Sequence, residues 1–227
     1  MNRLQTEIRR LYGIDAETRP GMEQQVRGLV LELARPADWK SLSRVWQGVQ
    51  ADLGLPAPAI AVNGRDGYQL WFSLDQAVPL SQAQDFLESL RQHYLPDVDG
   101  SRLRLLPGET ATLPTVPAPL QEAAGNWSAF VAPDLAAVFQ DDPWLDLPPG
   151  DEAQADLLSR LRSTPCVDLV RATQALAPQR QAGVTGSVPS GPAQTAWQDD
   201  PRRFLLQVMN DPGADLALRI EAAKALL

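Results

Sequence analysis

The sequence predicts an α+β fold, with elements in the order strand, helix, strand, strand, helix, strand over residues 1–110. Three observations lead to this prediction. Short β-rich runs carry apolar residues at every second position. Two stretches between these runs carry apolar residues at helical spacing instead. Turns that contain Gly or Pro separate the stretches, so each element has a defined end.

The first strand is expected at residues 26–33, where three leucines alternate, and Pro36 prevents its continuation. Asp38 is a suitable N-cap for the helix that follows. Gly54 and Pro56 end this helix. The apolar stripe that indicates the helix consists of Leu42, Val45, Trp46, Val49 and Leu53.

A second strand at residues 59–63 and a third at residues 68–74 flank the turn 64–67, which is a hairpin signal. The pair Ser81 and Gln84 has the spacing of a capping box and is expected to open the second helix. The apolar stripe of that helix consists of Ala83, Phe86, Leu87, Leu90 and Tyr94. Three helices are expected further along the chain, at residues 134–139, 152–161 and 167–176.

A last short strand at residues 102–106 completes an order that is typical of ferredoxin-like and RRM-like folds. In these folds both helices cover one face of the sheet, and the first and third strands are central. We therefore expect the other face to be open. The side chains expected on this open face are Val30, Glu32, Ala34, Gln69, Trp71, Ser73, Arg102 and Arg104.

A carboxylate and two guanidinium groups on one open face suggest a site for a phosphate-bearing ligand. Glu32 would hold a metal ion, and Arg102 and Arg104 would bind phosphate oxygens. The alternative is an ordinary solvated sheet face with loose ion pairs. Trp71 could stack on a base, or the segment 107–119 could cover it.

The sequence around these residues resembles the three motifs of archaeo-eukaryotic primases and small primase-polymerases. The resembling segments are 31–34, 63–72, and Asp99 followed by 102–108, within residues 25–110. The resemblance implies an RRM-like catalytic sheet that binds a nucleoside triphosphate with Mg²⁺ or Mn²⁺ and extends a primer. It implies catalytic positions at Glu32, Gln69 and Asp99, with Glu32 and Asp99 as metal ligands; Asp97 is the alternative to Asp99 as the acid of the third motif. The nucleotide or nucleic acid would be bound by Arg65, Trp71, Arg102 and Arg104.

The chain departs from the family pattern at two positions. The first motif has two acids one residue apart, and here Ala34 occupies the second place after Glu32. The second motif has a histidine where this chain has Gln69. Two-metal phosphoryl transfer needs several oxygen ligands, so we expect a degenerate, non-catalytic member associated with DNA replication of a phage or mobile element. The alternatives are a protein-interaction scaffold without a nucleic-acid site and an active metal-dependent nucleotidyltransferase.

The composition of the chain argues against several classes of function and site. The 227 residues carry a formal net charge of −8, which argues against bulk coating of nucleic acid or of anionic membranes. The single cysteine, Cys166, cannot form an internal disulfide, which favours the cytoplasm. The single histidine, His93, excludes a site that needs two imidazoles. No apolar run has the length of a membrane span, so no membrane partner is expected.

The chain divides into four predicted parts. Residues 1–120 form the primase-polymerase-like domain, and residues 121–177 form an acidic helical extension. Residues 178–198 are rich in Pro, Gly, Ser and Gln and are expected to be a flexible linker. Residues 199–227 are expected to form a helical hairpin, and they resemble the C-terminal tails of some phage terminase small subunits. A protein partner is expected to bind through 121–177 and 199–227.

Overall fold

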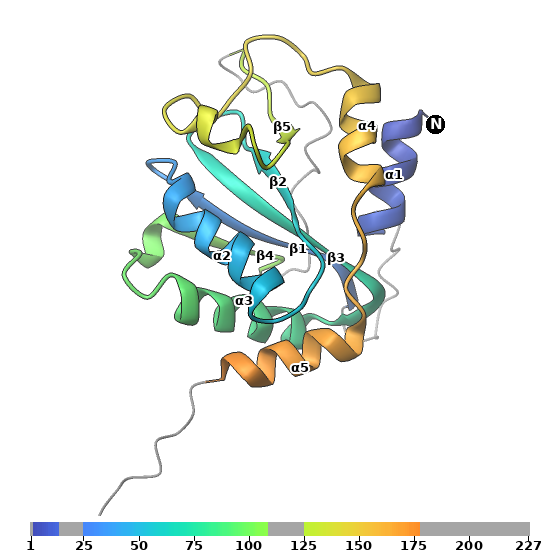
Figure 1. Cartoon of the computed structure of the whole chain (residues 1–227), viewed down its shortest axis with the longest axis vertical. Helices are drawn as coiled ribbons and strands as arrows, with labels where there is room; N and C mark the ends of the chain where they lie inside the picture. Colours follow the sequence, from blue (N-terminus) through green and yellow to red (C-terminus); the bar gives the residue numbers. More distant parts are fainter. Residues whose placement is uncertain (1, 14–24, 109–124, 178–227) are drawn as a thin grey trace, which may run out of the picture. The chain divides into compact units, whose positions relative to one another are not determined.

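The computed structural model describes residues 2–13, 25–108 and 125–177, which belong to one structural unit, Met1–Gln179 (Figure 1). The predicted linker and the C-terminal hairpin lie outside the described residues. The helical elements of the unit are α1 (Arg3–Tyr12), α2 (Trp39–Ala51), α3 (Leu80–Tyr94), the short 3₁₀ helices η1 (Gly100–Arg102) and η2 (Ala136–Phe139), α4 (Asp151–Ser159) and α5 (Cys166–Leu176). The strands are β1 (Gln25–Ala34), β2 (Ala59–Val62), β3 (Gly67–Pro79), β4 (Leu103–Leu106) and β5 (Ala129–Val131).

The strands form one antiparallel sheet in the order β4-β1-β3-β2-β5, which confirms the α+β class. The long strands β1 and β3 are paired in its centre, as the sequence predicted. β3 continues to Pro79, five residues beyond the predicted end at Leu74. β5 was not predicted, because only three residues form it.

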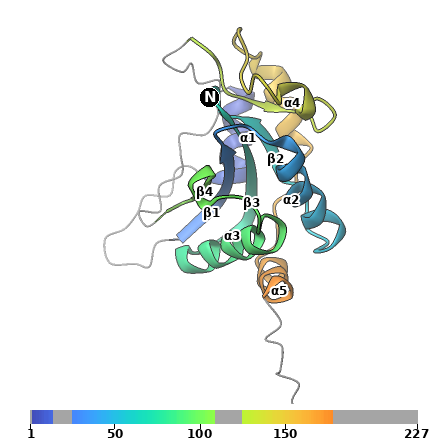
Figure 2. The same ribbon diagram turned by 90° about the vertical axis from the view of Figure 1, so that its left-hand side faces the viewer.

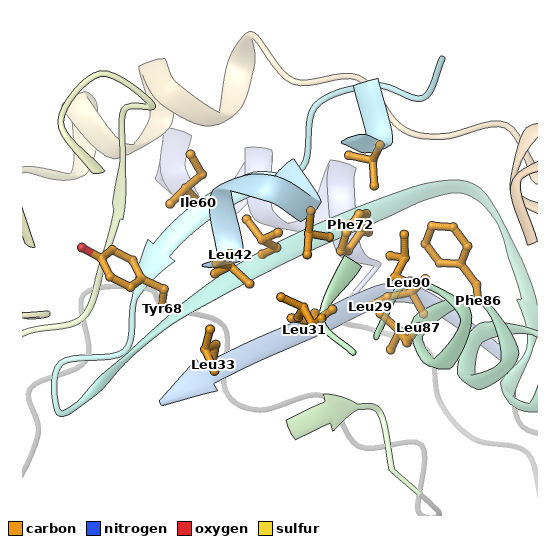
Figure 3. Close-up of a cluster of buried hydrophobic side chains, with 14 of the residues drawn as sticks. Leu29, Leu31, Leu33, Leu42, Ile60, Tyr68, Phe72, Phe86, Leu87 and Leu90 are labelled. Carbon is orange, nitrogen blue, oxygen red and sulfur yellow. The ribbon is translucent and has the colours of Figure 1, made fainter. Parts of the chain in front are cut away.

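The larger core lies between the sheet and the helices α2, α3 and α5. Figure 3 shows its side chains from the sheet, α2 and α3. The alternating leucines of β1 (Leu29, Leu31 and Leu33) point into this core. α5 packs beside α3, and Figures 1 and 2 agree on this placement. Period-two patterning therefore identified this face of the sheet correctly.

The first turns of α2 and α3 differ in how well the sequence predicted them. Asp38 caps α2, with its Oδ1 accepting a hydrogen bond from the Ser41 amide at 2.9 Å. The predicted capping box at Ser81 is wrong, because α3 begins at Leu80 directly after β3. The partner expected for Ser81, Gln84, instead donates from Nε2 to the Gly108 carbonyl at 3.0 Å.

A second core lies on the opposite face of the sheet, beneath α1 and α4, which lie side by side (Figure 1). The apolar stripe of α1 is buried against the sheet. The prediction that helices cover only one face is therefore wrong. The N-terminal segment carries four apolar residues in one short stripe and forms a helix that the predicted order of elements does not contain. The stripe consists of Leu4, Ile8, Leu11 and Tyr12.

Of the three helices predicted after the sheet, the first is the short 3₁₀ helix η2. The other two correspond to α4 and α5, shifted by one or two residues. Among the described residues, no helix has the length and apolar character that a membrane crossing requires.

Candidate functional site

Three of the predicted site residues meet on neighbouring strands. Glu32 lies in the middle of the central strand β1, directly opposite Gln69 of β3 on one side and Arg104 of β4 on the other. Cross-strand partners of this kind have Cβ atoms about 5 Å apart. The strand order therefore brings together a carboxylate, an amide and a guanidinium, as the sequence predicted.

These residues form a hydrogen-bonded chain that includes Trp71. The Trp71 indole N–H donates to Gln69 Oε1 at 2.8 Å, and Gln69 Nε2 donates to Glu32 Oε2 at 2.7 Å. Arg104 Nη1 lies 3.8 Å from the other carboxylate oxygen, Glu32 Oε1. We call Glu32, Gln69, Trp71 and Arg104 the polar chain. The Gln69 amide is engaged at both ends, which fixes the position of its oxygen and its nitrogen.

The polar chain is buried at one end and exposed at the other. The side chain of Glu32 is 8% exposed and that of Arg104 is 58% exposed. Trp71 is 1% exposed, and its ring packs edge-on against Tyr12 of α1 and Phe130 of β5, with centroids 5.3 and 6.3 Å away. The prediction of an open face that offers Trp71 to a base is therefore wrong, because side chains of α1 and β5 pack against the buried indole.

Two other arginines predicted to bind nucleotide or nucleic acid have different surroundings. Arg102 donates from Nη2 to the Pro36 carbonyl at 2.8 Å and from Nε to the Ala34 carbonyl at 3.4 Å. Its guanidinium thus holds the end of β1 in place. Arg65 lies exposed at the tip of the β2–β3 turn, where its amide donates to Asn63 Oδ1 at 2.9 Å. Neither residue converges with Trp71 on a common open site.

Asp99 caps the short helix η1 and does not take part in the polar chain. Its Oδ1 accepts a hydrogen bond from the Ser101 amide at 2.7 Å. Hydrogen bonds from Ser101, supported by the nearby charge of Arg102, lower the pKa of the Asp99 carboxyl. The Asp99 carboxylate therefore has a structural role, as the cap of the helix that precedes β4.

The residues present do not fit the Mg²⁺ or Mn²⁺ site that the resemblance implies. One oxygen of Glu32 accepts the Gln69 amide, and the other faces the positive charge of Arg104. No group of three His, Cys, Asp or Glu side chains in residues 2–13, 25–108 and 125–177 is arranged to hold a metal ion. A divalent cation would have to displace both neighbours of Glu32 and would gain only one carboxylate.

Sequence reasoning missed the residues that close this face. The hydroxyl of Tyr12 is buried without a hydrogen-bond partner among the described residues, and burial raises its pKa. Gln154 of α4 binds the β5 edge, where its Oε1 accepts from the Phe130 amide at 2.7 Å and its Nε2 donates to the Phe130 carbonyl at 2.9 Å. The helical spacing of Leu4, Ile8 and Leu11 was the one signal that could have revealed the cover.

The arrangement as a whole is that of a filled sheet. Its central carboxylate lies between Gln69 and Arg104, and its aromatic residue is packed under a helix. Such a chain of hydrogen bonds fixes its buried side chains in place. In comparisons with known proteins, the sequence matches no protein-family model and none of the curated proteins.

Proposed function

We propose that this protein is a non-catalytic scaffold built on a primase-polymerase-like sheet, and that it binds a protein partner in the replication of a phage or mobile element. The observation that carries the proposal is the closure of the sheet face that would hold nucleotide and metal. Glu32 and Gln69 bind each other there, and Trp71 is covered by α1. The motif resemblance supplies the link to replication, and the lone Cys166 favours a cytoplasmic setting.

The proposal includes a ferredoxin-like arrangement of the first part of the unit. The order β4-β1-β3-β2, with α2 and α3 packed on one face, supports it. In this view β5 extends the sheet at the β2 edge, and α1 and α4 are additions that cover the second face. The additions convert a surface that could bind a ligand into a second core.

Loss of catalysis has two supports. The family pattern has an acid where Ala34 stands and a histidine where Gln69 stands. The remaining acid, Glu32, is 8% exposed and is held between Gln69 and Arg104. Removing a phosphate-contacting group and a metal ligand costs orders of magnitude in rate, and the burial of the remaining acid adds to this loss.

Primer extension and dinucleotide synthesis with Mg²⁺ or Mn²⁺ test the proposal directly. The full chain is expected to incorporate no more nucleotide than its Glu32→Ala variant. Template-dependent incorporation that disappears in Glu32→Ala would overturn the non-catalytic assignment.

A titration with labelled single-stranded DNA tests the scaffold part. We expect no binding that depends steeply on salt, since Arg104 faces Glu32 and the sheet face on which the arginines were expected to converge is a second core. Salt-sensitive binding that is lost in the Arg65→Ala/Arg104→Ala variant would replace the scaffold with a nucleic-acid binder. Circular dichroism of the variant ensures that the comparison is made between folded proteins.

A further inference from the structure

An apolar pocket lies at the end of the sheet where the pairing of β2 with β5 stops. The register pairs Ile60 with Val131, and continuing it by two residues brings Pro58 opposite Pro133. Neither proline has an amide hydrogen to donate to a further bond of the ladder. The ladder therefore ends here, and both prolines line the pocket.

Side chains from both faces of the sheet form the walls of this pocket. Trp46 of α2 comes from the face of the larger core, and Leu157 and Leu161, at the end of α4 and just after it, come from the face of the second core. The Trp46 indole N–H donates to the Pro58 carbonyl at 3.1 Å, so its polar group already has a partner. Every lining residue is apolar. We call this the Trp46 pocket.

The size of the Trp46 pocket limits what it can bind. It encloses about 350 Å³, part of which is open to solvent. This volume is at the lower end of the range for ligand pockets, about 300–1,000 Å³, and it suits one large apolar group rather than a long acyl chain. Water in the pocket meets no hydrogen-bonding side chain that is free, so its displacement by an apolar group favours binding.

Positive charge flanks the pocket on the side of α4. Arg160 and Arg162 directly precede and follow the lining residue Leu161, and both are exposed. Within the part of the chain that the structure describes, neither guanidinium group has a hydrogen-bond or ion-pair partner. Two exposed cations are thus available to a negatively charged ligand.

The two carboxylates that neighbour lining residues in the sequence have other surroundings. Asp156, beside Leu157, lies 2.6 Å from Arg3 Nη1 and is paired with it. Asp134, beside Pro133, is exposed on the side of β5. The rim is therefore positive next to α4 and negative next to β5, in a chain whose net charge is −8.

We propose that the Trp46 pocket binds one large apolar side chain, Leu or Phe, of a partner protein, and that Asp or Glu beside this residue binds Arg160 and Arg162. A buried apolar anchor with a charged rim is typical of protein interfaces. The unequal charges of the rim fix the direction in which the partner segment lies across it.

This inference rests on the proposed scaffold function and names the chemistry of the partner. Nucleotide incorporation would remove the scaffold assignment and leave peptide binding to the pocket unchanged. Absence of peptide binding would leave the non-catalytic result unchanged. The two failures are therefore distinguishable.

Selection from a displayed library of random peptides tests the chemistry of the partner. The full chain is the bait, and counter-selection uses its Ala57→Leu variant, in which a larger side chain at a lining position fills the pocket. The enriched peptides should share one Leu or Phe with Asp or Glu beside it. Enrichment of no common sequence, of sequences without an apolar anchor, or of anchors flanked by basic residues would overturn the proposal.

Fluorescence anisotropy with one enriched, labelled peptide measures the contribution of the apolar pocket. Ala57→Leu should weaken binding about tenfold or more, since the anchor loses its space. Ala175→Leu, at an exposed position of α5, is the matched control and should leave binding unchanged. Circular dichroism of both variants ensures that folded proteins are compared.

Charge variants test the rim without altering the apolar lining. Arg160→Gln/Arg162→Gln should weaken binding about fivefold at low salt, and added salt should reduce this difference. Lys40→Gln/Arg171→Gln changes the net charge equally at exposed positions outside the lining and is the control. Asp134→Asn should tighten binding about twofold. Because all these positions are exposed, the test remains valid if the pocket-filling variant fails to fold. Equal weakening by the two double variants would overturn the proposed role of the rim.

Two other occupants of the pocket are outcomes of the same measurements. Light scattering of the wild-type chain detects a dimer, and a dimer that Ala57→Leu abolishes would assign the pocket to a second copy of the chain. Phenylbutyrate, a small anion with one apolar ring, represents a free small molecule. If it binds the pocket more tightly than every enriched peptide, the pocket is a small-molecule site. Either result would overturn the proposal of a protein partner.

Discussion

At the scale of single residues, Gln69 shows how one amide can bind two buried partners. In the resembled family this position carries a histidine, whereas here the amide bridges Trp71 and Glu32. A neutral histidine has one donor and one acceptor, but they lie on opposite sides of a ring. The terminal amide of Gln69 places both groups side by side, which suits two partners on adjacent strands.

Gln69→Leu is expected to destabilise the fold by about 3 kcal/mol, because it leaves the Glu32 carboxylate with one partner fewer and the buried Trp71 N–H with none. Urea unfolding followed by circular dichroism measures this loss. Gln76→Leu, an exposed glutamine of the same strand, is the matched control and should change stability by less than about 0.5 kcal/mol. Equal effects of the two substitutions would show that the polar chain contributes nothing.

Arginine has an unexpected role in this chain. Arg10, Arg27 and Arg102 donate to main-chain carbonyls of other elements. Arg35 does the same to the Ser101 carbonyl at 2.6 Å. Sequence reasoning assigned Arg102 to a phosphate, since a guanidinium suits both partners equally well. Only the three-dimensional position of the carbonyl decides between them.

At the scale of elements, the edge of β5 is protected by a side chain instead of a strand. The Gln154 amide offers an acceptor and a donor to Phe130, as a neighbouring strand would. Free sheet edges promote pairing between molecules. α4 therefore both covers the sheet face and closes one edge of it.

Gln154→Ala should lower the free energy of unfolding by about 1–2 kcal/mol, since Phe130 loses both hydrogen-bond partners. Static light scattering should also show self-association through the exposed edge. Gln174→Ala, an exposed glutamine on α5, is the control. If both variants stay monomeric and equally stable, Gln154 does not protect the edge.

The contact between α2 and α3 depends on a glycine. A Cβ atom at Gly48 would lie 2.3 Å from Tyr94 Cε1, so only glycine lets the Tyr94 ring cross α2. Gly48→Ala is expected to destabilise the fold by about 1 kcal/mol, because the clash exceeds the gain in helix propensity.

The test of this contact is a double-mutant cycle with Tyr94→Ala. In that background Gly48→Ala should stabilise the fold, since the propensity gain remains and the clash is gone. Gly100→Ala, where a Cβ meets no atom within 4 Å, is the control for a glycine substitution as such. Destabilisation of similar size in both backgrounds would contradict the steric explanation.

The elements show what the sequence could and could not predict. Alternating leucines and turn residues were sufficient to locate four strands and their pairing around Glu32. They could not distinguish a solvated face from a second core, because Glu32, Gln69 and Ser73 are polar yet buried. Hydrogen bonds between strands satisfy Glu32 and Gln69 internally, and no local pattern reveals such bonds. The helical spacing of Leu4, Ile8 and Leu11 in the N-terminal segment was the clue to the cover.

At the scale of the whole described unit, local hydrogen bonds and charges lower the pKa of carboxyl groups. Burial by itself would raise the pKa of Asp38, but hydrogen bonds from Ser41 and the charges of Arg102 and Arg44 lower it. Hydrogen bonding to Arg91 lowers the pKa of Glu88, against a smaller effect of burial. A lowered pKa in the folded state stabilises the fold above the unfolded-state pKa, near 4, and this stabilisation is lost as pH falls through the folded-state value.

The melting temperature should therefore decline as the pH is lowered below about 4. Asp38→Asn retains a good N-cap for α2 and removes one titrating group, so its melting temperature should depend less on pH in this range. Differential scanning calorimetry between pH 7 and pH 2 measures both. Asp134→Asn, at an exposed position, is the control. A decline equally steep in Asp38→Asn would show that Asp38 does not contribute.

The bonds from arginines to carbonyls have a consequence for chemical labelling. Dicarbonyl reagents such as phenylglyoxal attack guanidinium groups, and a loss of function after labelling is commonly taken to locate a phosphate site. Here Arg10 links α1 to the end of α4, and Arg27 links the end of α1 to β3. Their labelling should therefore accelerate when the unit unfolds, and should report the packing of α1 rather than the binding of phosphate.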